Sequence, residues 1–340
     1  MIGAGHEVIF IEKNKIGFPR ISTLQKKNGL TLVSPFFPID YRLRFRIPII
    51  NECYQLWLFR RLKNTFGDVV VINFDYTAHR LSSIFKNSIY YCNDEYIGNS
   101  KYPIWIINVY HRKIEGIVAK NSCFCIGTAN YLVEKLNKFN SSVYKIPLGG
   151  PNPKKINTIH HPRKTEKIKV GLMGSIKLNY ISVKIINKIL EQEDIKLVFI
   201  GTIDPLLKNQ IKQFDKISSL GILTGSSLYK EMASFDVAIA PYDVKNINAG
   251  GTPNKLLQYL ACGCPVVISD IPNINRTSFP SGSVYIANDE MQFISKIRLA
   301  HKEDSPQHVK IRRQYAIENT WEQRIQLFLE KIKAHGLNRK

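Results

Sequence analysis

Short apolar runs alternate with longer segments whose apolar residues recur every three or four positions. The apolar runs predict strands at residues 5–12, 69–74, 89–92, 123–126, 143–147, 168–174, 195–201, 222–224, 237–240 and 266–269. The periodic segments predict helices at residues 78–85, 104–121, 129–139, 228–235, 253–262 and 314–334. Strands that alternate with helices indicate an α/β fold with parallel, doubly wound sheets, in which ligands bind beyond the carboxyl ends of the strands.

The length of 340 residues is enough for two domains that each bury a core. Residues 151–167 are rich in proline and lysine and show no apolar period, which is typical of a linker. We therefore expect one Rossmann-like domain over residues 1–150, a second over 168–315, and a C-terminal helix over 316–340 that crosses back to the first domain.

One stretch, residues 236–273, combines a buried strand, a glycine-containing loop and a helix. Pro241 and Tyr242 end the strand, and a polar loop leads to Gly250 and Gly251. Thr252 is the expected cap of a helix that starts at Pro253 and ends at Gly263 in the left-handed conformation. Its spacing predicts two faces, a core face of Leu256, Leu257 and Leu260, and an opposite face of Lys255, Gln258 and Tyr259.

The chemistry of this stretch suits a nucleoside diphosphate. A helix N-terminus offers N–H groups and partial positive charge, and Lys255 in the first turn adds a full charge. Gly250 and Gly251 allow the backbone to approach a phosphate closely, and Gln258 can reach the ribose hydroxyls. Another interpretation remains open, namely a capped surface helix with a solvated lysine.

The formal net charge of +21 indicates an anionic partner. The sequence carries no zinc-ligand spacing and no recognisable nucleic-acid motif, so an anionic membrane surface is the better hypothesis. No apolar run approaches the ~20 residues of a membrane span, and no signal peptide opens the sequence. Six cysteines fit reduced core positions of a cytosolic protein, rather than metal ligands.

Residues 41–63 interleave basic side chains with apolar and aromatic ones, as interfacial membrane elements do. The expected membrane or acceptor contacts are Arg42, Arg44, Arg46, Trp57, Arg60 and Arg61. A core helix with a solvated basic edge explains the same pattern, and the sequence leaves both interpretations open.

The order P-N-K-L-L-Q-Y-L-A-C-G-C-P-V-V, residues 253–267, resembles the donor-site signature of GT-B-fold glycosyltransferases of the family-4 type. It is closest to the K-L-L-Q variant of the xanthan-type glucuronosyltransferase group. The resemblance covers most of the chain and implies that Lys255 holds the diphosphate and Gln258 the ribose of a nucleotide-sugar, with UDP-sugar as the expected donor. The expected donor site comprises Gly174, Ser175, Tyr242, Gly250, Gly251, Thr252, Asn254, Lys255 and Gln258.

The resemblance also bears on the mechanism. Retaining members carry two glutamates eight positions apart, whereas this sequence has Gly250 and Gln258 there. Direct, inverting transfer needs a base for the acceptor hydroxyl, and the segment I-Y-Y-C-N-D-E resembles the one that carries an aspartate base in the inverting group. We choose Asp94 over Asp75, Glu95, His79 and His111, while a capping role for Asp94 stays open.

The implied acceptor is a glycan or a lipid-linked sugar at the cytoplasmic face of the membrane, in surface polysaccharide synthesis of the bacterial type. No cofactor and no bound metal are expected, because no D-x-D motif stands in a donor-site context. Two alternatives remain, a sugar-nucleotide epimerase of the same fold and an inactive nucleotide-sugar-binding relic.

The segment G-H-E-V at residues 5–8 corresponds to the second strand of the N-terminal domain in the resembling family. A first strand, a glycine-rich loop and a helix precede it there. We therefore expect a reading frame that is truncated or started late. The other interpretation is a fold that begins at this strand.

Overall fold

The structure is a computed structural model that describes residues 5–26, 29–44, 46–97, 105–162, 166–247, 251, 253–274 and 276–337. It divides into two compact units. The first consists of Met1–Gly127, Leu132–Lys145 and Phe328–Lys340, and the second of Thr128–Tyr131 and Ile146–Leu327. The chain thus passes into the second unit after Lys145, close to the boundary predicted at residue 150.

The first unit contains two small sheets with helices beside them. Its elements are β1 (Val8–Ile11), β2 (Lys15–Ile16), β3 (Arg20–Lys26), β4 (Leu30–Phe37), α1 (Tyr41–Arg44), α2 (Pro48–Phe66), β5 (Val71–Asn73), α3 (Leu81–Ile84), β6 (Ser88–Cys92), α4 (Trp105–Asn121), β7 (Phe124–Gly127), α5 (Asn130–Leu136) and β8 (Val143–Lys145). Strands β5, β6, β7 and β8 pair in that order and are all parallel. In the other sheet, β4 pairs with β1 and β2 in parallel and with β3 antiparallel.

The predicted α/β fold class is confirmed, and in this unit the strands are divided between two sheets. Strands β1 and β5 each stand at the end of their own sheet, and no strand of the described residues joins them. The expectation about the reading frame stays a prediction.

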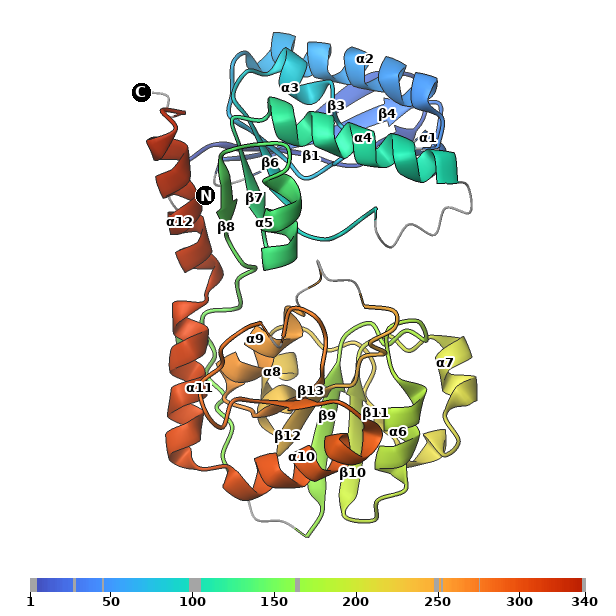
Figure 1. Cartoon of the computed structure of the whole chain (residues 1–340), viewed down its shortest axis with the longest axis vertical. Helices are drawn as coiled ribbons and strands as arrows, with labels where there is room; N and C mark the ends of the chain where they lie inside the picture. Colours follow the sequence, from blue (N-terminus) through green and yellow to red (C-terminus); the bar gives the residue numbers. More distant parts are fainter. Residues whose placement is uncertain are drawn as a thin grey trace. The chain divides into compact units, whose positions relative to one another are not determined.

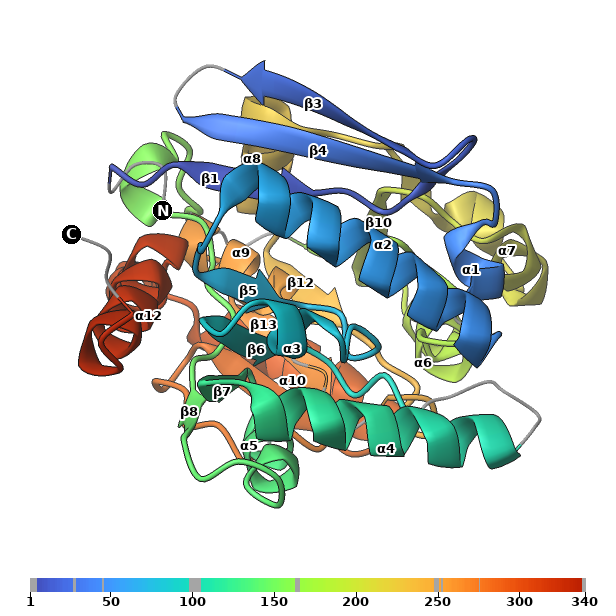
Figure 2. The same ribbon diagram turned by 90° about the horizontal axis from the view of Figure 1, so that it is seen from above.

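Apolar side chains of β4 and α2 form the core beside the first sheet, and Figure 2 shows α2 running alongside that sheet. Val33 of β4 and Leu58 and Leu62 of α2 are buried together. The antiparallel hairpin of β3 and β4 was not predicted, because β3 mixes polar and apolar residues without strict alternation. Pairing with β4 decides its conformation, and this is information that a local pattern does not hold.

The second unit is built on one sheet of six parallel strands with the order β11-β10-β9-β12-β13-β14. Figure 1 labels its elements, which are β9 (Ile168–Met173), α6 (Val183–Leu190), β10 (Ile195–Ile200), α7 (Pro205–Gln210), β11 (Ser218–Ser219), α8 (Gly225–Ala233), β12 (Val237–Ala240), α9 (Lys255–Cys262), β13 (Val266–Ser269), β14 (Val284–Ala287), α10 (Glu290–Glu303) and α11 (Pro306–Glu318). Helices α6 and α10 cover one face of the sheet, and α8 and α9 cover the other. This unit is doubly wound as predicted.

The predicted strand at residues 222–224 is absent. Strand β11 lies four residues earlier, and Gly221 leaves the sheet with a φ of +66°, a conformation that side-chain-bearing residues disfavour. Ile222 is consequently 70% exposed instead of buried in the sheet.

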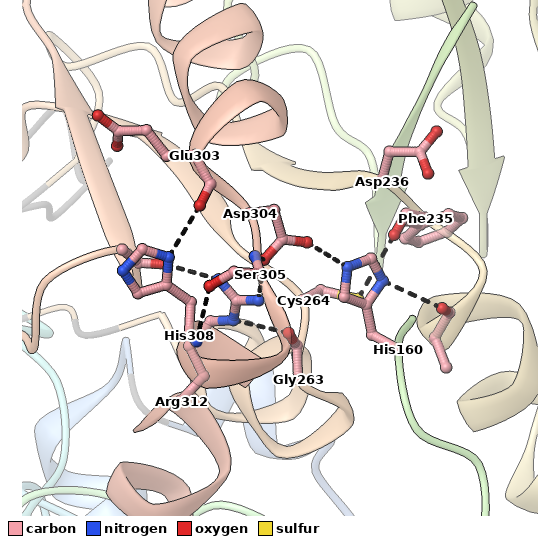
Figure 3. A network of polar contacts seen from close by, with 12 residues as sticks. His160, Phe235, Asp236, Gly263, Cys264, Glu303, Asp304, Ser305, His308 and Arg312 are labelled. Atoms are coloured by element: carbon pink, nitrogen blue, oxygen red, sulfur yellow. Dashed lines mark hydrogen bonds and ion pairs between the residues drawn. The ribbon is translucent and has the colours of Figure 1, made fainter. Parts of the chain in front are cut away.

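The segment 151–167, predicted to be the interdomain linker, is packed on the second unit where it is described. It begins with a short 3₁₀ turn (Pro153–Lys155), after which Ile156 and His160 are buried. Figure 3 shows the polar network around His160. The His160 imidazole lies 2.5 Å from the Asp304 carboxylate, which also pairs with the fully buried Arg312. This buried polar network binds the segment to the region where α10 ends and α11 begins.

The predicted C-terminal helix is broken into α11 and α12 (Trp321–Ala334). The backbone of Gly150 forms two hydrogen bonds with the junction between these helices. Its N–H donates to the carbonyl oxygen of Asn319, and its carbonyl oxygen accepts from the N–H of Trp321. A Cβ on Gly149 would lie 2.7 Å from the Trp321 backbone, so this close approach requires glycine. Residues from Phe328 onward belong to the first unit.

Candidate functional site

The strand order of the second unit reverses between β9 and β12. From β9 the chain adds β10 and β11 on one side, and it then returns to add β12, β13 and β14 on the other. Ligands of open α/β sheets bind at the carboxyl ends of the strands at such a switch point. Here those ends carry Gly174 after β9 and Tyr242 after β12.

Lys255, the first residue of α9, reaches this switch point. Its amino nitrogen lies 5.2 Å from the centroid of the Tyr242 ring, and a Cβ built on Gly174 would be 3.6 Å from it. No carboxylate of the described residues pairs with it. Burial lowers the pKa of the Lys255 ammonium from its ordinary value to about 8. The switch point therefore contains a half-buried cation that has no anionic partner among the described residues.

Two glycines bring the loops after β9 and β10 unusually close together. Gly201 has a φ of +120°, and a Cβ there would lie 2.1 Å from the carbonyl oxygen of Gly174. The N–H of Gly201 donates to Gly221 (2.7 Å), which places the exposed Ile222 loop beside this edge. Ser175 is exposed next to Gly174, and its hydroxyl lies 3.4 Å from that of Thr202. The edge thus combines backbone accessible to a phosphate with an apolar surface suited to a nucleobase.

Helix α9 begins two residues later than predicted. Asn254 precedes it in helical conformation, and the Asn254 side chain does not cap the helix. Gly263 ends it in the left-handed conformation (φ 91°), as predicted. Gln258 is half-buried one turn beyond Lys255. The N–H of Leu256 donates to the carbonyl oxygen of Pro253 (3.2 Å), and the partial positive charge of the helix start favours an anion there.

The prediction for Tyr259 is wrong, since its side chain is fully buried in the core rather than on the face of Lys255. Its hydroxyl accepts a hydrogen bond from the N–H of Met173 (2.7 Å) and so fixes the end of β9 against α9. Leu257 was expected in the core but is only half-buried. It packs against Gly150, where an added Cβ would lie 2.6 Å from the Cβ of Leu257. Sequence spacing alone did not show which of these side chains face the core, because residues 256–260 go more than once around the helix.

Two expected donor-site residues, Gly250 and Thr252, lie outside the described part of the chain. Gly251 between them is described, and its carbonyl oxygen accepts from the side-chain amide of Asn273 (2.8 Å). Asn273, which sequence reasoning missed, follows β13 and is buried. It anchors the loop that leads into α9 to the neighbouring strand of the sheet.

We predict that Tyr259→Phe lowers the free energy of unfolding by about 1–3 kcal/mol, because the buried N–H of Met173 loses its acceptor. Urea unfolding measures the change. Tyr285→Phe is the control, since that hydroxyl donates to an exposed Glu303 and its loss should cost less than about 1 kcal/mol. Equal effects of the two substitutions would show that the Tyr259 bond does not hold β9.

Asp94 lies in the first unit, directly after β6 at the carboxyl edge of the sheet β5-β6-β7-β8. Its side chain is half-buried, and Oδ1 accepts from the N–H of Glu95 (2.8 Å). The thiol of Cys92 donates to its carbonyl oxygen (3.4 Å). The structure therefore places Asp94 at the predicted edge, in a loop that is held by its own backbone contacts.

The other candidate bases are committed to structural contacts. Glu95 is buried and forms an ion pair with Lys135 (3.0 Å). Asp75 accepts from both the N–H and the hydroxyl of Thr77 (2.8 and 2.7 Å). His79 lies 2.8 Å from Glu52 through one ring nitrogen and 3.1 Å from a carbonyl through the other. His111 is buried against the ring of Tyr76.

The expected membrane segment is largely a core helix. Tyr54, Leu58, Phe59 and Leu62 of α2 face the domain interior, and Trp57 packs on Phe37. Arg44, expected at a membrane or acceptor surface, is buried with its guanidinium on Asn51 and 4.0 Å from the Tyr54 ring. Arg42, Arg46, Arg60 and Arg61 are exposed. Helix α2 therefore fits the second interpretation, a core helix with a solvated basic edge.

Within the described ranges, no three or more histidine, cysteine or acidic side chains are grouped so as to hold a metal ion. The six cysteines are free. Among the helices that the structure describes, none combines the length and apolar character that a membrane crossing requires.

Comparison with known proteins agrees with this geometry. Residues 168–302, most of the second unit, match the family model described as glycosyl transferases group 1. The second unit therefore resembles this glycosyltransferase family. No curated protein matches the sequence.

Solved structures of GT-B glycosyltransferases show the same fold along most of this chain. A sucrose-phosphate synthase from Thermosynechococcus elongatus superposes with a TM-score of 0.74 at 12% identity, covering 99% of this chain and 91% of that one. Anabaena HepE in complex with UDP gives 0.63 at 12%, with 82% of each chain covered. The lipopolysaccharide outer core galactosyltransferase WaaB gives 0.64 at 12%, covering 89% and 84%.

Proposed function

We propose that this glycosyltransferase moves a sugar from a UDP-sugar to a hydroxyl of a glycan or lipid-linked acceptor in surface polysaccharide synthesis, at the cytoplasmic face of the membrane. The observation that carries the proposal is the half-buried ammonium of Lys255, which stands without an anionic partner at the switch point of the second unit. The solved relatives support it, because one is bound to UDP and another is a lipopolysaccharide galactosyltransferase.

In this proposal the second unit holds the donor. Lys255 and the first-turn N–H groups of α9 neutralise the diphosphate, which removes the need for a tightly held metal or a cofactor. Gln258 binds the ribose hydroxyls, and the exposed Ile222 supports the base. Tyr242, Gly174 and Ser175 line the phosphate side, with Asn254 at the start of the helix.

The first unit supplies the base. The acceptor oxygen forms a bond to the anomeric carbon while the bond from that carbon to the diphosphate oxygen breaks, and UDP leaves. The proton of the acceptor hydroxyl passes to Asp94. Because Gln258 stands where retaining members carry a glutamate, we propose that the displacement is direct and inverts the anomeric configuration.

A thermal-shift screen with UDP-, GDP- and dTDP-sugars, followed by a donor-hydrolysis assay, tests the proposal. The proposal requires stabilisation by UDP-sugars above the others, together with slow release of UDP. Interconversion of two donor sugars without UDP release would identify an epimerase. Binding without any turnover would identify an inactive relic.

The low pKa of Lys255 gives a prediction for pH. The ammonium form is the one that attracts diphosphate, so UDP affinity should fall as pH rises through about 8, by up to tenfold per pH unit. Calorimetry between about pH 7.5 and 9.5 measures the slope, and Lys255→Met should remove it. An affinity that is flat over this range in the wild-type protein would show that Lys255 does not meet the phosphates.

A further inference from the structure

Large apolar side chains are exposed at one end of the first unit. Phe18 is 87% exposed and Ile16 is 67% exposed, on either side of the turn between β2 and β3. Leu43 in α1 is 53% exposed, and Ile49 at the start of α2 is 77% exposed. Single exposed apolar residues are common on protein surfaces, whereas several at one end of a domain indicate a contact surface.

These residues come from segments that the structure holds together. Strand β2 pairs with the end of β4, which leads directly into α1. The amide of Asn14 donates to the carbonyl oxygen of Ile39 (2.9 Å), and the Lys13 ammonium lies 4.8 Å from the centroid of the Tyr41 ring. Figure 2 shows the start of β3 and helix α1 at the same end of the sheet. Residues 13–20 and 41–49 therefore form one surface, which we call the hairpin-end surface.

The charges on the hairpin-end surface have one sign. Its exposed basic side chains are Lys13, Lys15, Arg20, Arg42 and Arg46. Residues 12–49 contain eight basic residues and only two acidic ones, Glu12 and Asp40. Glu12 lies 3.4 Å from Lys15, and Asp40 accepts from the backbone of Arg42 (2.9 Å). A net positive field remains around the exposed apolar tip.

We propose that the hairpin-end surface is the membrane-docking surface, with Phe18 and Ile16 inserted among the lipids and the basic residues on anionic headgroups. This inference rests on the membrane part of the proposed function and specifies the residues that perform it. The hairpin-end surface takes the membrane role that the sequence suggested for α2, because the apolar side chains of α2 are buried in the domain core. Exposed apolar side chains surrounded by cations fit an anionic membrane surface, because the apolar side chains can enter the acyl region while the cations contact the negatively charged headgroups.

Sedimentation with vesicles tests the proposal on the full chain. We expect binding to vesicles of phosphatidylcholine with about one third phosphatidylserine, weak binding to pure phosphatidylcholine, and release as salt rises. Ile16→Ser with Phe18→Ser should reduce the partition coefficient at least tenfold, since two buried apolar side chains are lost. Leu206→Ser with Met291→Ser, in the second unit and similarly exposed, should leave it unchanged.

A second pair of variants distinguishes the effect of the charges on the hairpin-end surface from the effect of the net charge of the protein. Replacing Lys13, Lys15, Arg20 and Arg46 with glutamine should weaken binding by roughly fivefold per charge. The same four changes at Lys184, Lys212, Lys216 and Lys230 remove equal charge from exposed positions of the second unit. Equal losses in the two variants would overturn the proposal, because the net charge alone would then explain binding.

Other occupants give different results. If the serine variant changes light-scattering mass but not vesicle binding, the surface joins two copies of the chain, and the proposal is wrong. If single-stranded RNA binds and vesicles do not, the partner is nucleic acid, and the proposal is again wrong. UDP affinity is measured on the same variants and should be unchanged. Loss of vesicle binding with normal UDP affinity assigns the effect to docking, whereas absence of UDP binding in the wild-type protein would count against the donor assignment alone.

Discussion

Lys255→Met is expected to raise the stability of the unliganded protein and to weaken UDP binding by roughly tenfold to a hundredfold. Burial lowers the pKa of Lys255 from 10.5 to about 8, so the folded protein bears the cost of a desolvated charge. At 1.36 kcal/mol per pKa unit, removing that charge should add about 3 kcal/mol to the free energy of unfolding at neutral pH. Methionine fills similar volume and is a good helix former, so α9 should persist.

The size of this stabilisation depends on pH. The unfolded chain binds the lysine proton up to about pH 10.5, while the folded one releases it near pH 8, so wild-type stability recovers as pH rises between these values. The advantage of the methionine variant should therefore be full below about pH 8 and vanish near pH 10.5. Urea unfolding of both proteins at several pH values measures it.

UDP binding should change in the opposite direction. A charge-assisted contact to phosphate contributes about 1.5–3 kcal/mol, which corresponds to roughly a tenfold to hundredfold loss of affinity. Lys169→Met is the control, since Lys169 pairs with Glu231 (2.8 Å) and its removal should not weaken UDP binding. A stabilised variant with unchanged UDP affinity would separate Lys255 from the donor site and refute the phosphate role.

Asp94→Asn should lower turnover by about 10²–10⁴-fold, because the amide cannot accept the proton of the acceptor hydroxyl. Donor affinity should be nearly unchanged, since the donor residues belong to the second unit. Asparagine keeps the Oδ1 that accepts from Glu95 N–H, so the loop should keep its conformation. Release of UDP from the donor identified by the screen measures turnover.

Asp75→Asn is the matched control for this prediction. Asp75 follows the neighbouring strand β5, and its contacts to Thr77 also survive with an amide oxygen. Turnover should stay close to that of the wild-type protein. If Asp94→Asn is equally active, the base lies elsewhere, and a product with retained anomeric configuration would exclude the inverting mechanism altogether.

The sequence predicted most elements of the second unit because their patterns are strong locally. The apolar runs at residues 168–173, 195–200, 237–240 and 266–269 all became strands of one buried sheet. Gly263 ends α9 as predicted, since only a residue without Cβ adopts the left-handed conformation readily. Lys255 could be singled out from its position in the first turn of the helix.

Other features depend on tertiary contacts and were not visible in the sequence. The close approach of Gly201 to Gly174 joins two loops that are distant in sequence. The buried contact of Tyr259 with Met173 and the anchoring of Gly251 by Asn273 likewise need the folded sheet. In the first unit, the pattern of α2 fitted both a membrane and a core, and only its packing on β4 decided between them.

The most direct test of the central claim is a calorimetric titration of the wild-type protein with UDP and, separately, with uridine at about pH 7.5. The account predicts one site that binds UDP more tightly than uridine by roughly tenfold to a hundredfold, because the diphosphate meets Lys255 and the start of α9. Equal affinities for the two ligands, or no binding of UDP, would contradict it.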